Sequence, residues 1–148
     1  MRIRSIKPEF WRSDDIAALD WDDRLLFIGL WSYVDDNGVG RDEERIIAAD
    51  LFALDASFSE SSLRVHDGLM RLHAANLIER YEVNGRHFLH ITTWEKHQKI
   101  NRPSPGRYPL PIVAGATETV EKPTKPRTFS ESSQQLHESS VSPHNITR

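Results

Sequence analysis

Residues 84 and 85, Asn-Gly, constrain the fold of this chain more than any other pair. They separate two segments rich in β-branched and aromatic residues, LIERYEV at 77–83 and RHFLHIT at 86–92. Asn-Gly between such segments is the strongest short signal for a two-residue hairpin with a type I′ turn. In that register the facing pairs are Val83 with Arg86, Tyr81 with Phe88, Glu79 with His90 and Ile78 with Ile91.

Helical segments precede the hairpin. The expected helices cover residues 14–19, 21–36, 43–52 and about 60–75, and a short strand is expected at 39–41. The expected N-terminal caps are Ser13, the pair Asp20 and Asp23, Asp42, and either Ser57 or Ser59. The main elements follow in the order helix, strand, helix, helix, hairpin. This order predicts an α+β fold of the winged helix-turn-helix type, with a three-helix core and the hairpin as a C-terminal wing.

The composition changes after residue 103. Residues 104–148 are dominated by Pro, Ser, Thr and Gly without apolar periodicity, which predicts a disordered, flexible C-terminal tail. PLPIV at 109–113 is the exception and is expected to pack as a short extended segment. The predicted winged-helix domain is therefore 1–103, with a basic strap from about residue 95, and the tail is 104–148. Charge follows the same division, with net −6 over residues 1–94 and net +4 over residues 95–127.

Several classes of protein are not expected. The chain has no Cys, which excludes disulfides and thiolate metal sites. Its seven His match no zinc pattern, no phosphate-loop motif is present, and most acidic residues stand at expected helix starts, where capping explains them. We therefore expect no enzyme activity, no metal and no cofactor. No apolar run is long enough to span a membrane and no signal peptide precedes the domain, so we expect a cytoplasmic protein.

The third helix of a helix-turn-helix domain is the expected recognition helix. Arg64 and Arg71 are seven residues apart and hence nearly on one helical line, with Ser61 and Gly68 on the same side. We expect this line to face away from a buried side formed by Leu63, Val65, Leu69, Met70 and Leu72. Arg suits bidentate reading of guanine. The alternative interpretation is that both Arg residues only contribute solubility.

Two further segments carry candidate DNA contacts. At the wing tip, Asn84 and Arg86 are placed to touch DNA, although Asn-Gly also serves the turn itself. The strap, WEKHQKINRPSPGR, follows at residues 94–107. Its candidate contact residues are Lys96, Lys99, Asn101 and Arg102, with His97, Gln98 and Arg107 beside them. The alternative is a solvated linker that Trp94 pins to the core. Arg2, Arg4 and Lys7 would join the same patch if the N-terminal segment lay beside the wing.

Two ends of the sequence resemble a known family. IRSIKPEFW and RLLFIGLWSYVDDNGVGRDE near the start, and WEKHQKINRP after the hairpin, resemble the N-terminal winged-helix domain of phage replication initiation proteins, the DnaD-like replisome organisers. The resemblance covers about residues 2–112. It implies a phage or prophage helix-turn-helix protein that binds origin DNA or self-associates in the host cytoplasm. In such relatives a C-terminal region contacts the replicative helicase or its loader. Here only a short polar segment follows Pro111, so helicase loading is not expected.

The expected partners follow from these patterns. Double-stranded DNA is the main one, in replication initiation. A homodimer is expected through the helix at 21–34, which carries more aromatic residues than a small core needs: Trp21, Phe27, Trp31 and Tyr33, with Val34 at its end. A replication protein is a candidate partner of the tail. Two alternatives stay open, a transcriptional regulator with the same DNA contacts and an acidic protein-interaction module that binds a host or phage replication protein.

Overall fold

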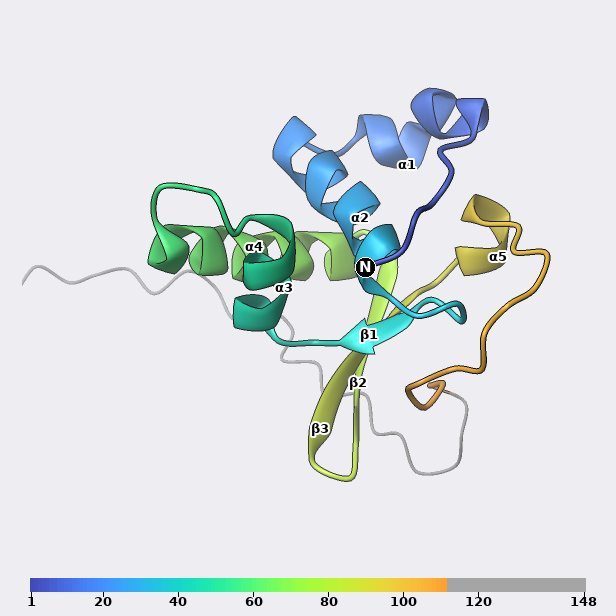
Figure 1. Cartoon of the computed structure of the whole chain (residues 1–148). Coiled ribbons are helices and arrows are strands. Elements are labelled where there is room, and N and C mark those ends of the chain that lie inside the picture. Colours follow the sequence, from blue (N-terminus) through green and yellow to red (C-terminus); the bar gives the residue numbers. More distant parts are fainter. Residues whose placement is uncertain (112–148) are drawn as a thin grey trace, which may run out of the picture.

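The computed structural model describes residues 1–111. Within them the fold is α+β, and a long hairpin projects away from a group of helices (Figure 1). In chain order the elements are η1 (a 3-10 helix, Pro8–Arg12), α1 (Asp14–Ala17), α2 (Trp21–Tyr33), β1 (Val39–Arg41), α3 (Glu44–Leu51), α4 (Phe58–Ala74), β2 (Ile78–Val83), β3 (Arg86–Ile91) and α5 (Trp94–His97). The α+β class expected from the sequence is confirmed. Residues 112–148, most of the predicted tail, lie outside the described residues.

The hairpin has the predicted register. Val83 pairs with Arg86, Tyr81 with Phe88, Glu79 with His90, and Ile78 with Ile91. Asn84 and Gly85 adopt φ of 51° and 75°, the left-handed pair that a type I′ turn requires. The local signal alone was sufficient because both turn residues tolerate positive φ.

The third strand, β1, pairs antiparallel with β3, so the strand order is β1-β3-β2. Gly38 introduces it with φ of 80°. A Cβ atom at this position would lie 2.6 Å from Trp94 Cγ, so glycine is required both by the backbone and by the packing of α5 against the turn. The strand expected at residues 39–41 is confirmed.

The core forms around α2. Phe27, Leu30 and Trp31 are buried there, in contact with apolar residues from α1, α3, α4 and the hairpin. Not all of the apolar residues of α2 take part. Trp21 and Leu25, one turn apart, are 82% and 59% exposed.

Most of the predicted helix caps are wrong. Ser57 does cap α4, accepting a hydrogen bond from the Glu60 amide. No side-chain cap is present at Ser13 or Asp20, and α3 is preceded by Glu43 rather than by Asp42. Asp23 and Asp42 instead bind arginines that lie far away in the sequence, Arg71 and Arg80. A distant guanidinium outcompetes the local backbone because it offers two donors to one carboxylate.

The predicted strap at residues 94–107 divides into α5 and the segment that follows it. From here on, the name strap refers to that segment, residues 98–111. Two adjacent acidic residues hold its backbone. The amide of Ser104 donates to Asp36 (2.8 Å) and the amide of Arg107 donates to Asp35 (3.0 Å). Farther along, the Tyr81 hydroxyl donates to the carbonyl of Pro109 (2.6 Å), and Tyr108 packs on Phe88. The boundary expected at residue 103 therefore falls inside a packed segment, because carboxylates at 35 and 36 bind its backbone.

None of the helices within residues 1–111 has both the length and the apolar character needed to cross a membrane.

Candidate nucleic-acid interface

Helix α4 turns the predicted contact line towards the core rather than towards solvent. Ser61 is buried, and a Cβ atom on Gly68 would lie 2.5 Å from Leu26 Cδ2 of α2. Leu63 and Met70, which were expected in the core, are exposed. Val65, Leu69 and Leu72 are buried as expected, so the predicted orientation of α4 is wrong only in part: its buried side is rotated towards Ser61 and Gly68 and away from Leu63 and Met70.

Two small residues explain the difference. Ser61, Val65, Gly68 and Leu72 recur at helical spacing and form the buried stripe of α4, with Leu69 beside them. Ser61 and Gly68 have little or no side chain, so α2 can approach this stripe closely. The prediction took only large apolar residues as core candidates, so it included Leu63 and Met70 and left out Ser61 and Gly68.

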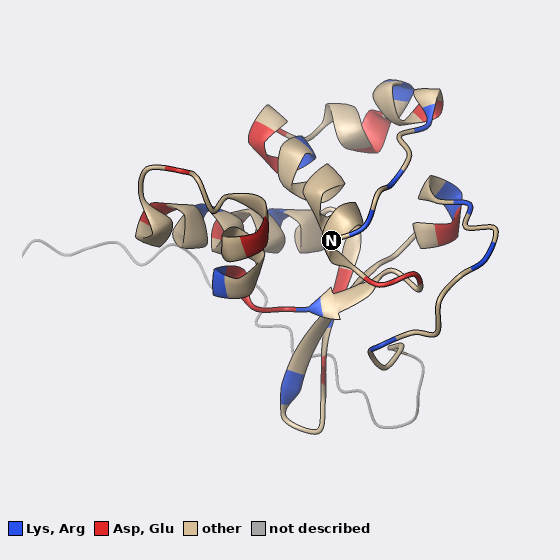
Figure 2. Ribbon diagram, in the orientation of Figure 1, with Lys and Arg blue, Asp and Glu red and all other residues tan. Residues whose placement is uncertain are grey.

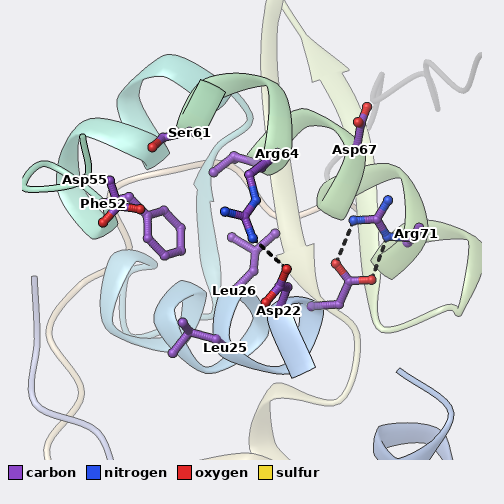
Figure 3. A pocket seen from close by; sticks show the side chains of 11 residues that line it. Asp22, Leu25, Leu26, Phe52, Asp55, Ser61, Arg64, Asp67 and Arg71 are labelled. Atoms are coloured by element: carbon purple, nitrogen blue, oxygen red, sulfur yellow. Dashed lines mark hydrogen bonds and ion pairs between the residues drawn. The ribbon is translucent and has the colours of Figure 1, made fainter. Parts of the chain in front are cut away.

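Both arginines of the predicted line bind aspartates of α2 (Figure 3). The guanidinium of Arg71 donates two hydrogen bonds to the buried carboxylate of Asp23, at 2.6 and 3.0 Å. Arg64 donates one to Asp22 at 2.6 Å, in a pair exposed to solvent on both sides. Neither arginine is free to read a base without giving up an aspartate.

The outward face of α4 carries an acidic residue and no cation. It presents Ser59, Leu63, His66, Asp67 and Met70, with Phe58 exposed at its start. Arg45 of α3 lines the same shallow groove as Leu63 and His66, together with Glu44. The face can make apolar and hydrogen-bonding contacts but supplies little attraction for phosphate.

The hairpin tip is fully accessible. Asn84, Gly85 and Arg86 are all exposed, and Arg86 forms no ion pair within residues 1–111. Asn84 is accounted for by the turn. Arg86 remains a cation on an exposed tip, two residues from Phe88, which contacts the strap.

Residues of α5 and the strap divide into two groups. Trp94 pins the start of α5, as expected, and its indole N–H donates to the Asp36 carbonyl (2.9 Å). Gln98 is buried and exchanges hydrogen bonds with the backbone of Ser5, so it belongs to the fold rather than to a surface. The exposed group comprises Lys96, Lys99, Asn101, Arg102 and Arg107.

The N-terminal segment lies beside α5 and the end of α2, not beside the hairpin tip. Arg4 is largely buried, donating to the carbonyls of Trp31 and Val34 and to the Asp36 carboxylate. It therefore caps the end of α2 and is not available to a ligand. Lys7 differs, since its ammonium donates to the carbonyl of Lys96 (2.8 Å) and joins the N-terminal segment to α5.

His97 lies between these lysines and the core. Its ring stacks on Trp31, with centroids 4.9 Å apart. Burial, and then the nearby charges of Lys96 and Lys7, lower its pKa below the usual value. His97 therefore belongs to the packing of α5 against α2, and burial is the main cause of its lowered pKa.

The Lys and Arg residues of 1–111 thus differ in whether they form ion pairs. Those at positions 2, 4, 41, 64, 71 and 80 form ion pairs. Nine Lys and Arg residues of 1–111 form none. Three of these are Arg12, Arg24 and Arg45. The other six lie on the N-terminal segment, α5, the strap and the hairpin, and they define what we call the basic surface: Lys7, Arg86, Lys96, Lys99, Arg102 and Arg107.

Figure 2 shows blue segments on the N-terminal segment, on α5, along the strap and on the hairpin, whereas acidic residues are frequent on α2, α3 and the loop before α4. Acidic residues also lie close to the basic surface. Asp35 and Asp36 accept hydrogen bonds from the backbone of the strap, Glu82 lies on the hairpin, and Glu9 and Glu95 lie on η1 and α5.

Most residues of this surface were predicted from the sequence. Lys96, Lys99, Asn101, Arg102 and Arg86 are exposed as expected, whereas Ser61, Gly68 and Arg71 serve the contact between α2 and α4. Lys7 and Arg45 were not among the chosen contacts. The run of cations without an acid between residues 96 and 107 was the useful signal, because such a run leaves fewer local partners for intramolecular pairing.

Within the described part of the chain no group of His, Asp and Glu is arranged to hold a metal ion. Comparison with protein-family models, with curated proteins and with solved structures found no match.

Proposed function

We propose that residues 1–111 form a winged-helix domain that binds double-stranded DNA, and that the protein serves replication initiation in a phage or prophage. The order α2, β1, α3, α4 and the β2–β3 hairpin supports the winged-helix assignment. The replication role rests on the resemblance of its two sequence ends to phage replication initiation proteins.

One observation carries the DNA-binding proposal. Six cations without an ion-pair partner among residues 1–111 stand on adjoining segments of the basic surface, in a chain whose net charge is −3. Unpaired cations keep their full attraction for phosphate, and each that contacts a phosphate releases counterions from DNA. The hydrogen bonds that Asp35 and Asp36 accept from two amides of the strap hold it in place before binding, which lowers the ordering entropy that binding costs.

The proposed division of labour follows from the geometry. Lys96, Lys99 and Arg102 contact the phosphate backbone, while Arg86 reaches the adjoining groove from the hairpin tip. The outward face of α4 lies against the base edges with His66, apolar neighbours and Asp67 but no cation, so its discrimination between sequences is modest. Arg64 and Arg71 stay on their aspartates. A transcriptional regulator would use the same contacts, and only the position of the bound site, near a promoter or near an origin, separates the two roles.

The test is fluorescence anisotropy of the full chain on labelled duplexes tiled from its own genomic neighbourhood, at several salt concentrations. We expect binding that weakens steeply as salt rises. Lys99→Ala should weaken binding to every tile alike and reduce the salt slope by about one unit. Arg64→Ala is the matched control, since it also removes one positive charge, and should change neither quantity.

Two results would contradict the proposal. The first is no binding even at low salt, which favours the protein-interaction alternative. The second is a relaxed preference between tiles in Arg64→Ala together with unchanged binding in Lys99→Ala, which would return the contact to the recognition-helix arginines.

A further inference from the structure

A groove runs between α2 and α4, away from the basic surface. It has a volume of 270 Å³, and residues of α2, α4 and the loop between α3 and α4 line it. Its floor is apolar and is formed by Leu25, Leu26, Phe52 and Val65. Figure 3 shows Asp22 and Arg64 meeting across it, with Asp55 at one end and Asp67 near the other.

The rim of the groove is acidic. Four aspartates and two arginines line it, so the lining residues carry a net charge of −2. Asp22 and Asp23 are paired with arginines. Asp55 and Asp67 are exposed and have no ion-pair partner within the described residues. The groove therefore attracts a cation and repels the phosphates of DNA.

Exposed apolar residues extend the floor beyond the rim. Leu25 is 59% exposed and lies one turn from Trp21, which is 82% exposed. Leu54, next to the rim residue Asp55, is fully exposed. Large exposed apolar side chains beside a groove are typical of docking sites. The ligand it fits combines positive charge with at least one large apolar side chain.

A second copy of the domain fits this surface poorly, because two copies joined groove to groove would place like charges opposite each other. The chain itself contains a segment of the required chemistry, EKPTKPRTF at residues 121–129, with a net charge of +2. Its Lys122, Lys125 and Arg127 are the only Lys or Arg between residues 112 and 147, and Phe129 follows them directly.

We propose that residues 121–129 of the same chain dock in the groove between α2 and α4. Lys122, Lys125 and Arg127 approach the carboxylates of the rim, and Phe129 covers the apolar floor at Leu25 and Phe52. Pro123 and Pro126 limit the conformations that the free segment can adopt, which reduces the entropy lost on docking. This proposal does not depend on DNA binding.

The connection is long enough. The described chain ends at Pro111, which lines the same cavity as His73 of α4. His73 is two residues beyond Arg71, which lines the groove. Ten residues, 112–121, connect Pro111 to Lys122 and can span roughly 33 Å when extended. The groove follows α4 from Ser61 to Arg71, a distance of roughly 15 Å at the helical rise. The segment can therefore reach any point of the groove.

Arg64 gives the proposal a distinctive consequence. Arg64 already donates a hydrogen bond to the Asp22 carboxylate inside the groove. It therefore competes with an incoming lysine or arginine for that carboxylate. Removing Arg64 should strengthen the docking of the segment, whereas removing a cation from a nucleic-acid site weakens binding there. The same substitution therefore separates a cationic from an anionic ligand of this groove.

The test uses the full-length chain, which has no native Cys. A nitroxide label is attached to Thr128→Cys, and paramagnetic broadening of backbone amide signals is measured by NMR. We expect the amides of Asp22, Leu25, Asp55 and Asp67 to lose most of their intensity, and Arg64→Ala to deepen that loss. In a background of Asp55→Lys and Asp67→Lys the intensities should return. A label at Ser142→Cys, outside the basic segment, is the matched control and should leave the groove signals intact.

Three results would overturn the proposal. They are unchanged groove signals with the label at 128, equal broadening from the labels at 128 and 142, and broadening that persists in the Asp55→Lys and Asp67→Lys background. A mixture of labelled protein with unlabelled, isotope-enriched protein decides between one chain and two. Broadening in the unlabelled partner would show that a second copy supplies the segment, which also contradicts docking within one chain.

Discussion

Arg71 on α4 donates two hydrogen bonds, from Nε and Nη2, to the buried carboxylate of Asp23 on α2, at 2.6 and 3.0 Å. The side chain of Asp23 is 4% exposed and that of Arg71 is 53% exposed. The pair is thus half buried, and it joins the two helices that enclose the acidic groove. We expect Arg71→Ala to lower the free energy of unfolding by about 2 kcal/mol, because it leaves a buried carboxylate unpaired while solvent reduces the full cost of a buried pair. Chemical denaturation of the variant and of the unaltered chain measures this loss of unfolding free energy.

The neighbouring pair of Arg64 with Asp22 is the control for that prediction. Both of its side chains are mostly exposed, so Arg64→Ala should leave the unfolding midpoint unchanged. Arg71→Lys should recover only part of the loss, since a lysine lacks the planar fork. Equal midpoints for Arg71→Ala and Arg64→Ala would show that the contact with Asp23 does not stabilise the fold.

Gly38 gives a prediction about backbone and packing together. At φ of 80° any L side chain is strained, and a Cβ atom would in addition lie 2.6 Å from Trp94 Cγ. We expect Gly38→Ala to cost more than about 2 kcal/mol, the sum of the left-handed backbone penalty and the displacement of Trp94.

Gly85→Ala is a matched comparison for Gly38→Ala. Gly85 has φ of 75° but nothing within 4 Å of its Cβ position. Gly85→Ala should therefore lower the free energy of unfolding only by the backbone penalty, about 1–2 kcal/mol. Thermal unfolding of the two variants compares them directly, and a Gly85→Ala variant as unstable as Gly38→Ala would remove the role assigned to Trp94.

Asp36 predicts an acid-sensitive attachment of the strap. The hydrogen bond from the Ser104 amide, and then that from Arg4, lower the pKa of Asp36. A carboxylate whose pKa is lower in the folded state stabilises the fold above its unfolded pKa, about 3.9 for aspartate, and this contribution is lost as pH falls below that value towards the native pKa. We therefore expect the stability of the full chain to fall steeply on acidification below about pH 4, with early loss of hydrogen-exchange protection at the Ser104 amide.

In Asp36→Asn the acid dependence should be shallower and the protein less stable at neutral pH. Asp50→Asn, at an exposed position on α3, is the control. It should change neither the acid dependence of stability nor the stability at neutral pH. An Asp36→Asn variant whose stability falls with acid as steeply as that of the unaltered chain would contradict the assignment to Asp36.

The strap predicts where the folded unit ends. A chain of residues 1–111 should lose only what the docking of residues 121–129 contributes, whereas a chain of residues 1–103 should lose about 2–4 kcal/mol more. The shorter chain lacks the amides bound by Asp35 and Asp36 and uncovers Phe88 where Tyr108 packed on it. Denaturant unfolding of the two chains measures the difference, and equal stabilities would restore the boundary expected from composition.

Local sequence signals predicted the secondary structure well where that structure depends only on residues close together in the sequence. Asn84 and Gly85 specify the turn because few other residues adopt their backbone angles, and the turn then fixes the register of the two strands. Ser57, one of the two expected caps of α4, also acts locally. Its hydroxyl accepts a hydrogen bond from an amide only three residues away, and this contact is enough to cap the helix. Exposure of Lys99 and Arg102 followed from a stretch with few acids nearby in sequence.

The partners of charged and small residues were decided by the tertiary structure. Asp23 was expected to cap its own helix and Arg71 to contact DNA, yet they bind each other across 48 positions of the sequence. Gly68 was placed on the outer face because helical spacing alone does not state which side another helix will approach. The sequence by itself determined the hairpin, the order of elements and the basic stretch, because these depend on backbone preferences and composition. Only the folded chain determined which cations remain unpaired, since that depends on which carboxylates packing brings within hydrogen-bonding distance.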